Sequence, residues 1–165
     1  MITNGTPAGL DGLEIAETAV SPGRTITEAD VVSFAALTGD WHPQHSDATW
    51  AAESRFGRRV AHGMLLLSYA VGLVPLDPSR VVALRGICDV VFKRPVHIGD
   101  TIRVASRIDD VKPLDEETAL VRVSWRIVNQ SGEGVARAKL AIVWRRGAAA
   151  ADRPSTEPEL DEVFL

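Results

Sequence analysis

Met64–Val74, the run MLLLSYAVGLV, decides the fold of this chain. It is apolar all round when it is placed on a helix, and it carries no charge. That pattern is typical of a helix that is buried on every side. Pro75 ends the helix, because the residue before a proline is pushed out of the α region. A fully buried helix needs something wrapped around it, so the rest of the chain must supply a sheet.

The stretches after this helix have the composition of long strands, at 81–92, 101–111, 118–129 and 135–144. The third stretch alternates most clearly, with apolar residues at the odd positions from Ala119 to Ile127 and polar ones such as Arg122 between them. The connections at 112–117 and 129–134 are short and turn-rich enough for antiparallel hairpins. One buried helix followed by a meander of long strands predicts an α+β fold, with the sheet curled about the helix.

The segment before the buried helix predicts two short helices. Thr27 offers a hydroxyl cap with an acid three residues on, and Gly39 ends the first helix as C-terminal glycines do. The second helix is expected at 48–55, capped by Asp47 or Ser46.

Length and composition fit one globular domain, since the chain has 165 residues and 45% apolar content. We expect a loose N-terminal arm over residues 1–12 and a domain over 13–146 that opens with a strand at 13–20. Residues 147–165 have the composition of a flexible C-terminal tail.

Several functional classes are disfavoured by composition. The net charge is −4, and acidic and basic residues are interspersed, so the sequence has no basic cluster of the kind that binds nucleic acid or an anionic membrane. Cys88 is the single cysteine, so it cannot form an internal disulfide, and no Cys/His cluster has zinc spacing. The longest uncharged apolar run, 64–76, is shorter than the roughly 20 residues of a membrane span. The N-terminus also lacks the pattern of a signal peptide, so we expect a cytoplasmic protein.

Asp40 and His45 form the candidate catalytic pair. They lie five residues apart, a spacing that does not fit one helical face, with Pro43 between them and Gly39 before them. Both breakers favour irregular structure, so we expect two loop residues at a sharp bend that aims both side chains into one cleft. Taken singly, Asp40 could be an ordinary turn residue, and His45 could cap the following helix or be hydrogen-bonded in a loop.

The run Ala61–Met64, AHGM, is the second candidate element. The N–H of Gly63, reinforced by the helix dipole, could bind an oxygen on which negative charge develops. Alternatively, Gly63 only allows the helix to start close against a strand. His62 is expected to cap the helix rather than to perform chemistry. An acid, an imidazole and N–H donors are together the parts needed to move a proton next to a carbonyl.

Phe34–His45, FAALTGDWHPQH, followed six residues on by Ala51, resembles the signature of the MaoC-like, (R)-specific enoyl-CoA hydratases. In words, that signature is an aromatic, a short gap, an aliphatic, a small residue, Gly-Asp-x-Asn-Pro, an aliphatic, His and a small residue six positions on. The chain departs from it at His42, where the signature has Asn, and at Gln44, where it has an aliphatic. The likeness spans roughly residues 14–144. Further matching runs are Ala61–Met64, Phe92–Val96 and Gly99–Thr101.

The resemblance implies a single hot-dog fold, an antiparallel sheet wrapped around a buried central helix. It also implies that Asp40 and His45 hold one water. One of them accepts its proton as the hydroxyl adds to C3 of a trans-2-enoyl thioester, and the other delivers a proton to C2. The product is the (R)-3-hydroxyacyl thioester, and the reverse reaction is dehydration. Gly63 matches the family's oxyanion-binding donor, with His42 and His62 as possible supporting residues.

The expected partner is therefore an acyl thioester carried on CoA or on an acyl carrier protein. No metal and no redox cofactor is expected, since the thioester itself acidifies the C2 proton. Hot-dog units resemble one another in pairing their sheets edge to edge, which implies a homodimer or a higher homo-oligomer.

Two other functions remain open from the sequence. Hot-dog thioesterases share the fold but commonly place a carboxylate on or beside the buried helix, and 64–74 has no Asp or Glu. A non-catalytic acyl-binding subunit is the other alternative, with His42 as the mark of a lost activity. The retention of both Asp40 and His45 argues against it.

Overall fold

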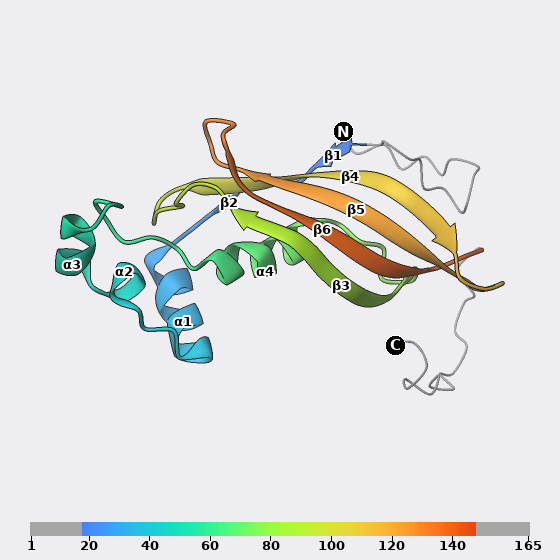
Figure 1. Cartoon of the computed structure of the whole chain (residues 1–165), viewed down its shortest axis with the longest axis horizontal. Coiled ribbons are helices and arrows are strands. Elements are labelled where there is room, and N and C mark those ends of the chain that lie inside the picture. Colours follow the sequence, from blue (N-terminus) through green and yellow to red (C-terminus); the bar gives the residue numbers. More distant parts are fainter. Residues whose placement is uncertain (1–17, 148–165) are drawn as a thin grey trace.

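The computed structural model describes residues 18–147, which form six strands and four helices. Figure 1 labels them, and their bounds are β1 (Thr18–Val20), β2 (Arg24–Thr25), α1 (Glu28–Thr38), α2 (Pro43–Ser46), α3 (Ala48–Glu53), α4 (Gly63–Leu73), β3 (Val81–Phe92), β4 (Thr101–Pro113), β5 (Thr118–Val128) and β6 (Gly134–Arg145). All four predicted long strands are confirmed, with ends within two residues of the predicted ones. The N-terminal arm and, apart from Gly147, the C-terminal tail lie outside the described residues.

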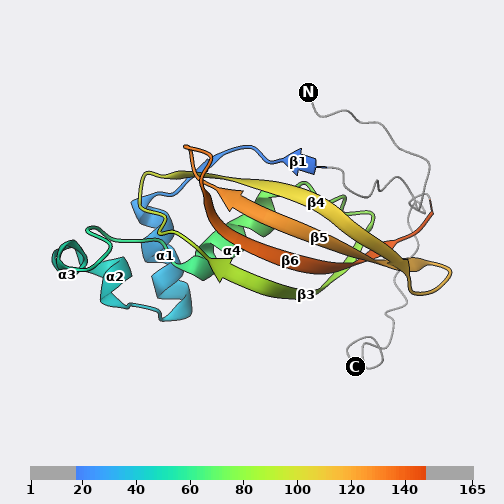
Figure 2. The same ribbon diagram turned by 45° about the horizontal axis from the view of Figure 1, so that its top comes forward.

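The strands form one antiparallel sheet in the order β1-β4-β5-β6-β3, and β2 pairs with β4. The alternation in β5 is as predicted: Val123 and Trp125 are buried, whereas Arg122 and Arg126 are exposed on the other face. Figure 2 shows the sheet curving over α4, whose apolar side chains share one core with those of β4, β5 and β6. This arrangement confirms the α+β, single hot-dog prediction.

Helix α4 differs from the prediction in one respect. Leu65, Leu66, Leu67 and Ala70 are buried against the sheet, but Met64 is 57% exposed. Residues 68, 71 and 72 are exposed on the same side of the helix. The expectation of burial on every side is therefore wrong for the single chain, because the sheet covers only one side of α4. Between residues 18 and 147 no helix is both long enough and apolar enough to cross a membrane.

Helices α1, α2 and α3 lie together at one end of the sheet, beyond the N-terminal end of α4 (Figure 1). The predicted cap of α1 is confirmed: Thr27 and Asp30 form a reciprocal capping box, and Gly39 ends the helix in the left-handed conformation with φ of 76°. Asp47 caps α3 through its carboxylate. The single turn of α2 was not predicted, because a four-residue helix has too few residues to show a period.

Candidate active site

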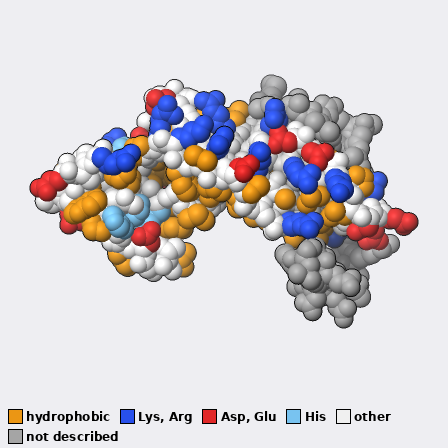
Figure 3. Space-filling view, in the orientation of Figure 1, with side chains coloured by type: hydrophobic (Ala, Val, Ile, Leu, Met, Phe, Trp, Pro, Cys, Tyr) orange, Lys and Arg blue, Asp and Glu red, His pale blue; other side chains and the backbone are white. Residues whose placement is uncertain are grey.

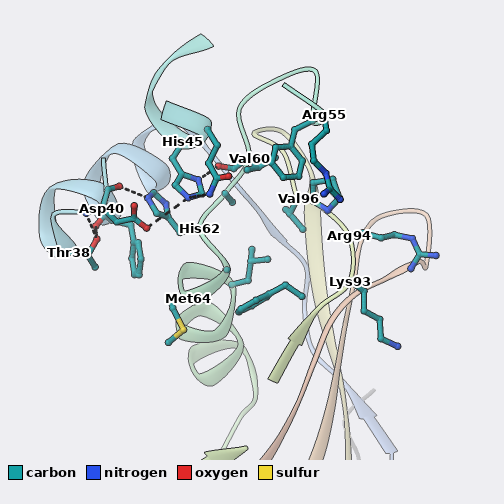
Figure 4. Close-up of a pocket in the computed structure, with 18 residues that line it drawn as sticks. Thr38, Asp40, His45, Arg55, Val60, His62, Met64, Lys93, Arg94 and Val96 are labelled. Carbon is teal, nitrogen blue, oxygen red and sulfur yellow. Dashed lines mark hydrogen bonds and ion pairs between the residues drawn. The ribbon is translucent and has the colours of Figure 1, made fainter. Parts of the chain in front are cut away.

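A cleft of 590 Å³ opens beside the N-terminal end of α4. The polar residues that line it include Asp40, Gln44, His45 and His62, and Gly63 lies at its wall. Figure 4 shows Asp40, His45 and His62 turned toward one another. In Figure 3 histidine side chains reach the surface at the same end of the molecule, beside acidic and hydrophobic side chains. The fold thus brings together the two separate sequence runs that were singled out as candidates.

His45 is held in one orientation and one tautomer. It lies in α2, so the prediction of a loop residue is wrong for it, and it is only 5% exposed. Its Nδ1 is 2.7 Å from the carbonyl oxygen of Val60. A carbonyl can only accept, so Nδ1 carries the proton and Nε2 of the neutral ring keeps a lone pair. That lone pair is what a general base needs.

Two residues that sequence reasoning did not assign to the pair support His45. Val60 donates its N–H to the carbonyl of Gln44 at 3.0 Å and accepts from His45, so two hydrogen bonds join α2 to the segment before α4. The side-chain amide of Gln44 donates to His45 Nε2, also at 3.0 Å. The sequence carries no signal for the Val60 contact, because a backbone carbonyl acts here and any residue supplies one.

Asp40 completes the pair from a more open position. Its side chain is 51% exposed, and Oδ2 lies 4.0 Å from His45 Nε2. That distance is too long for a direct hydrogen bond, but one water can bridge it. The other oxygen, Oδ1, accepts the N–H of His42 at 3.3 Å. Gly39 allows the sharp bend after α1, because a residue without Cβ adopts its left-handed φ without strain.

His42 stands where the family signature has Asn and performs a capping role that Asn also performs. Its Nδ1 accepts the N–H of Gln44 at 3.2 Å at the start of α2. Its ring packs edge-on against Trp50, with centroids 5.5 Å apart. His42 therefore shapes the bend between Asp40 and His45: its backbone N–H donates to Asp40, and its imidazole caps α2.

His62 occupies the N-cap position of α4, as expected, but its side chain makes no capping hydrogen bond. Instead its Nε2 lies 3.0 Å from the backbone carbonyl of Asp40, and its ring stacks on His45 with centroids 3.8 Å apart. Gly63 begins α4, where the N–H groups of the first turn have no acceptor inside the helix. A Cβ on Gly63 would lie 2.7 Å from the ring of Phe92, so the absence of a side chain is also needed for packing.

Burial lowers the pKa of His45, and the neighbouring His62 and His42 act in the same direction. The hydrogen bond to the Val60 carbonyl and the carboxylate of Asp40 oppose the decrease without cancelling it. The net effect favours the neutral ring. His45 is thus in the protonation state of a general base at neutral pH.

Asp40, His45 and His62 place one donor atom each within 4.8 Å of one another, a spacing that a metal ion could use. His62 Nε2 carries the proton that it donates to the Asp40 carbonyl, so this nitrogen has no lone pair to offer an ion.

The cations at the cleft differ in their contacts. Arg55, Lys93 and Arg94 line it. Arg94 donates to the Gly134 carbonyl at 2.7 Å, and in Figure 4 the side chains of Lys93 and Arg94 point away from the catalytic pair. Lys93 and Arg94 therefore lie at the cleft without contacting Asp40 or His45.

Several known proteins are similar to this chain in fold and in sequence. The chain is 49% identical over 86 residues to protein MaoC of Klebsiella aerogenes, of which it spans 26%, and 35% identical over 105 residues to an (R)-specific enoyl-CoA hydratase of Aeromonas caviae, of which it spans 75%. A solved R-hydratase from Pseudomonas aeruginosa superposes with a TM-score of 0.69 at 31% identity, covering 89% of this chain and 94% of that one. A monoamine oxidase regulatory protein from an Archaeoglobus species gives a TM-score of 0.80 at 37% identity, covering 89% and 100%. Residues 14–129 match the model of the MaoC-like domain, and the chain belongs to the MaoC-like dehydratase family.

Proposed function

We propose that this protein catalyses the reversible hydration of trans-2-enoyl thioesters to (R)-3-hydroxyacyl thioesters on CoA or acyl carrier protein. The observation that carries the proposal is the pair itself. A buried, neutral His45 presents its Nε2 lone pair 4.0 Å from the Asp40 carboxylate, in a cleft that ends at a helix N-terminus. The names of the Aeromonas hydratase and of a 3-hydroxybutyryl-CoA dehydratase from Methylorubrum extorquens, 34% identical over 93 residues, support the reaction class.

In the hydration direction, one water lies between Asp40 and His45. His45 Nε2 takes a proton from it while the oxygen bonds to C3, and the electron pair of the C2–C3 double bond moves toward the thioester. The imidazolium then returns the proton to C2 on the same face, which gives syn addition. The carboxylate of Asp40 accepts a hydrogen bond from the water and stabilises the transient charge on His45. All the atoms of the water end in the product, and the pair is restored.

The enolate-like oxygen that forms on the thioester needs donors. The N–H groups of the first turn of α4, beginning with Gly63, have no acceptor within the helix and lie at the cleft. The helix dipole adds a partial positive charge at the same point. We assign Gly63 as the oxyanion donor, and donors of this kind typically contribute about 10²–10³-fold to kcat.

The reaction needs neither a metal nor a redox cofactor, because the thioester carbonyl already acidifies the C2 proton. The protein is proposed to act as a homodimer in the cytoplasm. The case for the dimer rests on the unpaired edge of β3, which is argued below at the scale of the molecule.

The test is the hydration rate of crotonyl-CoA and longer enoyl-CoAs, followed at the enoyl-thioester absorbance. Asp40→Asn and His45→Gln should each lower kcat by about 10²–10⁴-fold and change KM far less, because proton transfer belongs to the transition state. The double variant should be little worse than the poorer single variant, since two groups on one water act as a unit. Dialysis against a chelator should leave the wild-type rate unchanged.

A thiol-release assay on the same substrates distinguishes the alternatives. Thioester cleavage without hydration would identify a thioesterase. Tight binding with neither reaction would identify an acyl-binding subunit. Wild-type hydration rates in both Asp40→Asn and His45→Gln would show that this pair does not carry the chemistry.

A further inference from the structure

His62 is the most buried polar side chain near the cleft, at 2% exposure, and the mechanism above gives it no role. One face of its ring lies against His45, with centroids 3.8 Å apart and planes 24° from parallel. Phe34 packs against it at 5.1 Å. The ring is thus fixed between the core and the catalytic imidazole.

The second contact of His62 is with Asp40, 22 residues away in the sequence. Its Nε2 donates to the backbone carbonyl of Asp40 at 3.0 Å. The carboxylate of Asp40 is half exposed and is otherwise held by a long bond from the His42 N–H. The buried donor of His62 therefore anchors the main chain from which that carboxylate projects.

We propose that His62 is the positioning residue of the catalytic pair: one ring fixes Asp40 through its carbonyl and fixes His45 through its face. The inference rests on the function proposed above and adds to it a third residue that touches no substrate. A misplacement of about 1 Å can cost roughly 10²-fold in rate, so a rigid link between acid and base matters to the reaction.

The tautomer explains why a histidine suits this position. The bond to the Asp40 carbonyl selects the form with its proton on Nε2, which leaves a lone pair on Nδ1. Within residues 18–147 that buried Nδ1 has no hydrogen-bond partner. One edge of the imidazole donates to the Asp40 carbonyl while one face stacks on His45, so a single side chain makes both contacts.

Two substitutions separate the two contacts. His62→Phe keeps the flat ring but removes the donor to Asp40, whereas His62→Gln keeps a donor and removes the ring face. The charged and titratable groups around His45 are Asp40, His42 and His62 itself, with Arg55 also lining the cleft. In His62→Gln the stacked ring is lost while a donor to Asp40 is kept, so a change in the titration of His45 in that variant reports on the ring.

For His62→Phe we expect kcat to fall by about 10–10²-fold with KM within about threefold, and the acid limb of kcat/KM to move less than in His62→Gln, because a ring still covers His45. For His62→Gln we expect the acid limb to move to higher pH, since removal of the ring lets water reach His45 and favours its charged form. His97→Gln is the matched control: His97 also donates to a backbone carbonyl, that of Arg59 at 3.0 Å, but does not line the cleft. The His97→Gln variant should leave kcat and the acid limb of kcat/KM unchanged.

The ring protons of His45, followed by NMR through a pH titration, give a readout that does not need turnover. Their midpoint should rise in His62→Gln and move less in His62→Phe, whatever reaction the protein catalyses. Folded variants with wild-type kcat, acid limb and NMR midpoint would overturn the proposal. If His62→Gln does not fold, His62→Phe retains the volume and decides the question through kcat alone. If the wild type is inactive but the NMR midpoint of His45 still shifts in His62→Gln, the positioning role stands and the proposed reaction is rejected.

Discussion

Gln44 is the residue at which this chain departs most from its family in chemical terms. Where the signature has an aliphatic, an amide donates to His45 Nε2 at 3.0 Å. In the proposed mechanism this atom accepts the proton of the water, so the amide competes with the substrate water for one lone pair. The departure at His42 is milder, because its Nδ1 caps α2 as an Asn side chain would.

Replacing Gln44 by leucine, the family's kind of residue, should therefore raise kcat by about two- to tenfold, because a typical net hydrogen bond is worth about 0.5–1.5 kcal/mol. The acid limb should also move to higher pH, since a donor to Nε2 stabilises the neutral ring. Initial rates over a pH series measure both. His42→Asn is the companion variant, and it should keep the wild-type rate or exceed it. A Gln44→Leu enzyme that is slower at every pH would mean that the amide holds the water rather than competing with it.

The residues of the site could be predicted only in part. The spacing of Asp40 and His45 and the AHGM run selected side chains that the fold brings together at one cleft. The contact of His62 with the Asp40 carbonyl, and that of His45 with Val60, were not predictable, because backbone acceptors leave no mark in a sequence.

At the scale of the elements, a partly exposed ionic cluster joins β2, α1 and α4. Tyr69 and Arg24 both donate to the carboxylate of Asp30, and the Arg24 guanidinium lies 4.6 Å above the Tyr69 ring. Burial acts to raise the pKa of Asp30, but the hydrogen bonds from Tyr69, Thr27 and Arg24 outweigh it and lower the pKa to about 2. The cluster fixes α1, and hence the bend at Asp40, against α4.

This cluster predicts a pH dependence of stability. The folded pKa of Asp30 lies below the unfolded value of 3.8, so its stabilisation is present above pH 3.8 and is lost as the pH falls toward 2. The lost contribution is about 2 kcal/mol at 1.36 kcal/mol per pKa unit. Urea unfolding at pH 7 and at points down to pH 2 should show the free energies of wild type and Asp30→Asn converging by that amount. Tyr69→Phe should give a smaller decrease, and parallel curves would contradict the assignment.

Helix α4 carries the second prediction at this scale. Leu67 is 3% exposed in the core, and Leu67→Asp should unfold the protein, because an unpaired buried charge costs several kcal/mol of a total of about 5–15. Val32→Asp is the control, since Val32 is an exposed apolar residue on α1. Circular dichroism melting compares them, and a folded Leu67→Asp protein with unchanged melting would contradict this architecture.

The strands were predicted well because the alternation of apolar and polar residues can be recognised within each stretch of sequence by itself. The short α2 and the open side of α4 were not, for different reasons. A single turn has no period to detect. An apolar helix surface shows that something covers it, but not whether the cover comes from the same chain or from another one.

At the scale of the whole molecule, β3 is a sheet edge with an apolar surface. In the described part of the chain it pairs with β6 alone. Its exposed apolar side chains are Val82, Leu84, Ile87, Val90, Val91 and Phe92. Met64 and Val71 add the open side of α4. A long unpaired edge invites pairing with another chain, and an apolar patch of this kind marks an interface. A second copy, paired through β3, would cover both features and account for a helix that is apolar on all sides.

We therefore expect a homodimer, with light scattering at micromolar concentration giving twice the mass of one chain. Leu84→Lys should weaken it, because a charge on the paired edge would be buried against its own copy. Leu114→Lys is the control, an equally exposed leucine in the turn after β4. Phe92 and Met64 line the cleft and also belong to this apolar surface, so dissociation should raise KM. A wild-type monomer would contradict the dimer, and a monomeric Leu84→Lys protein with full activity would show that one chain completes the site.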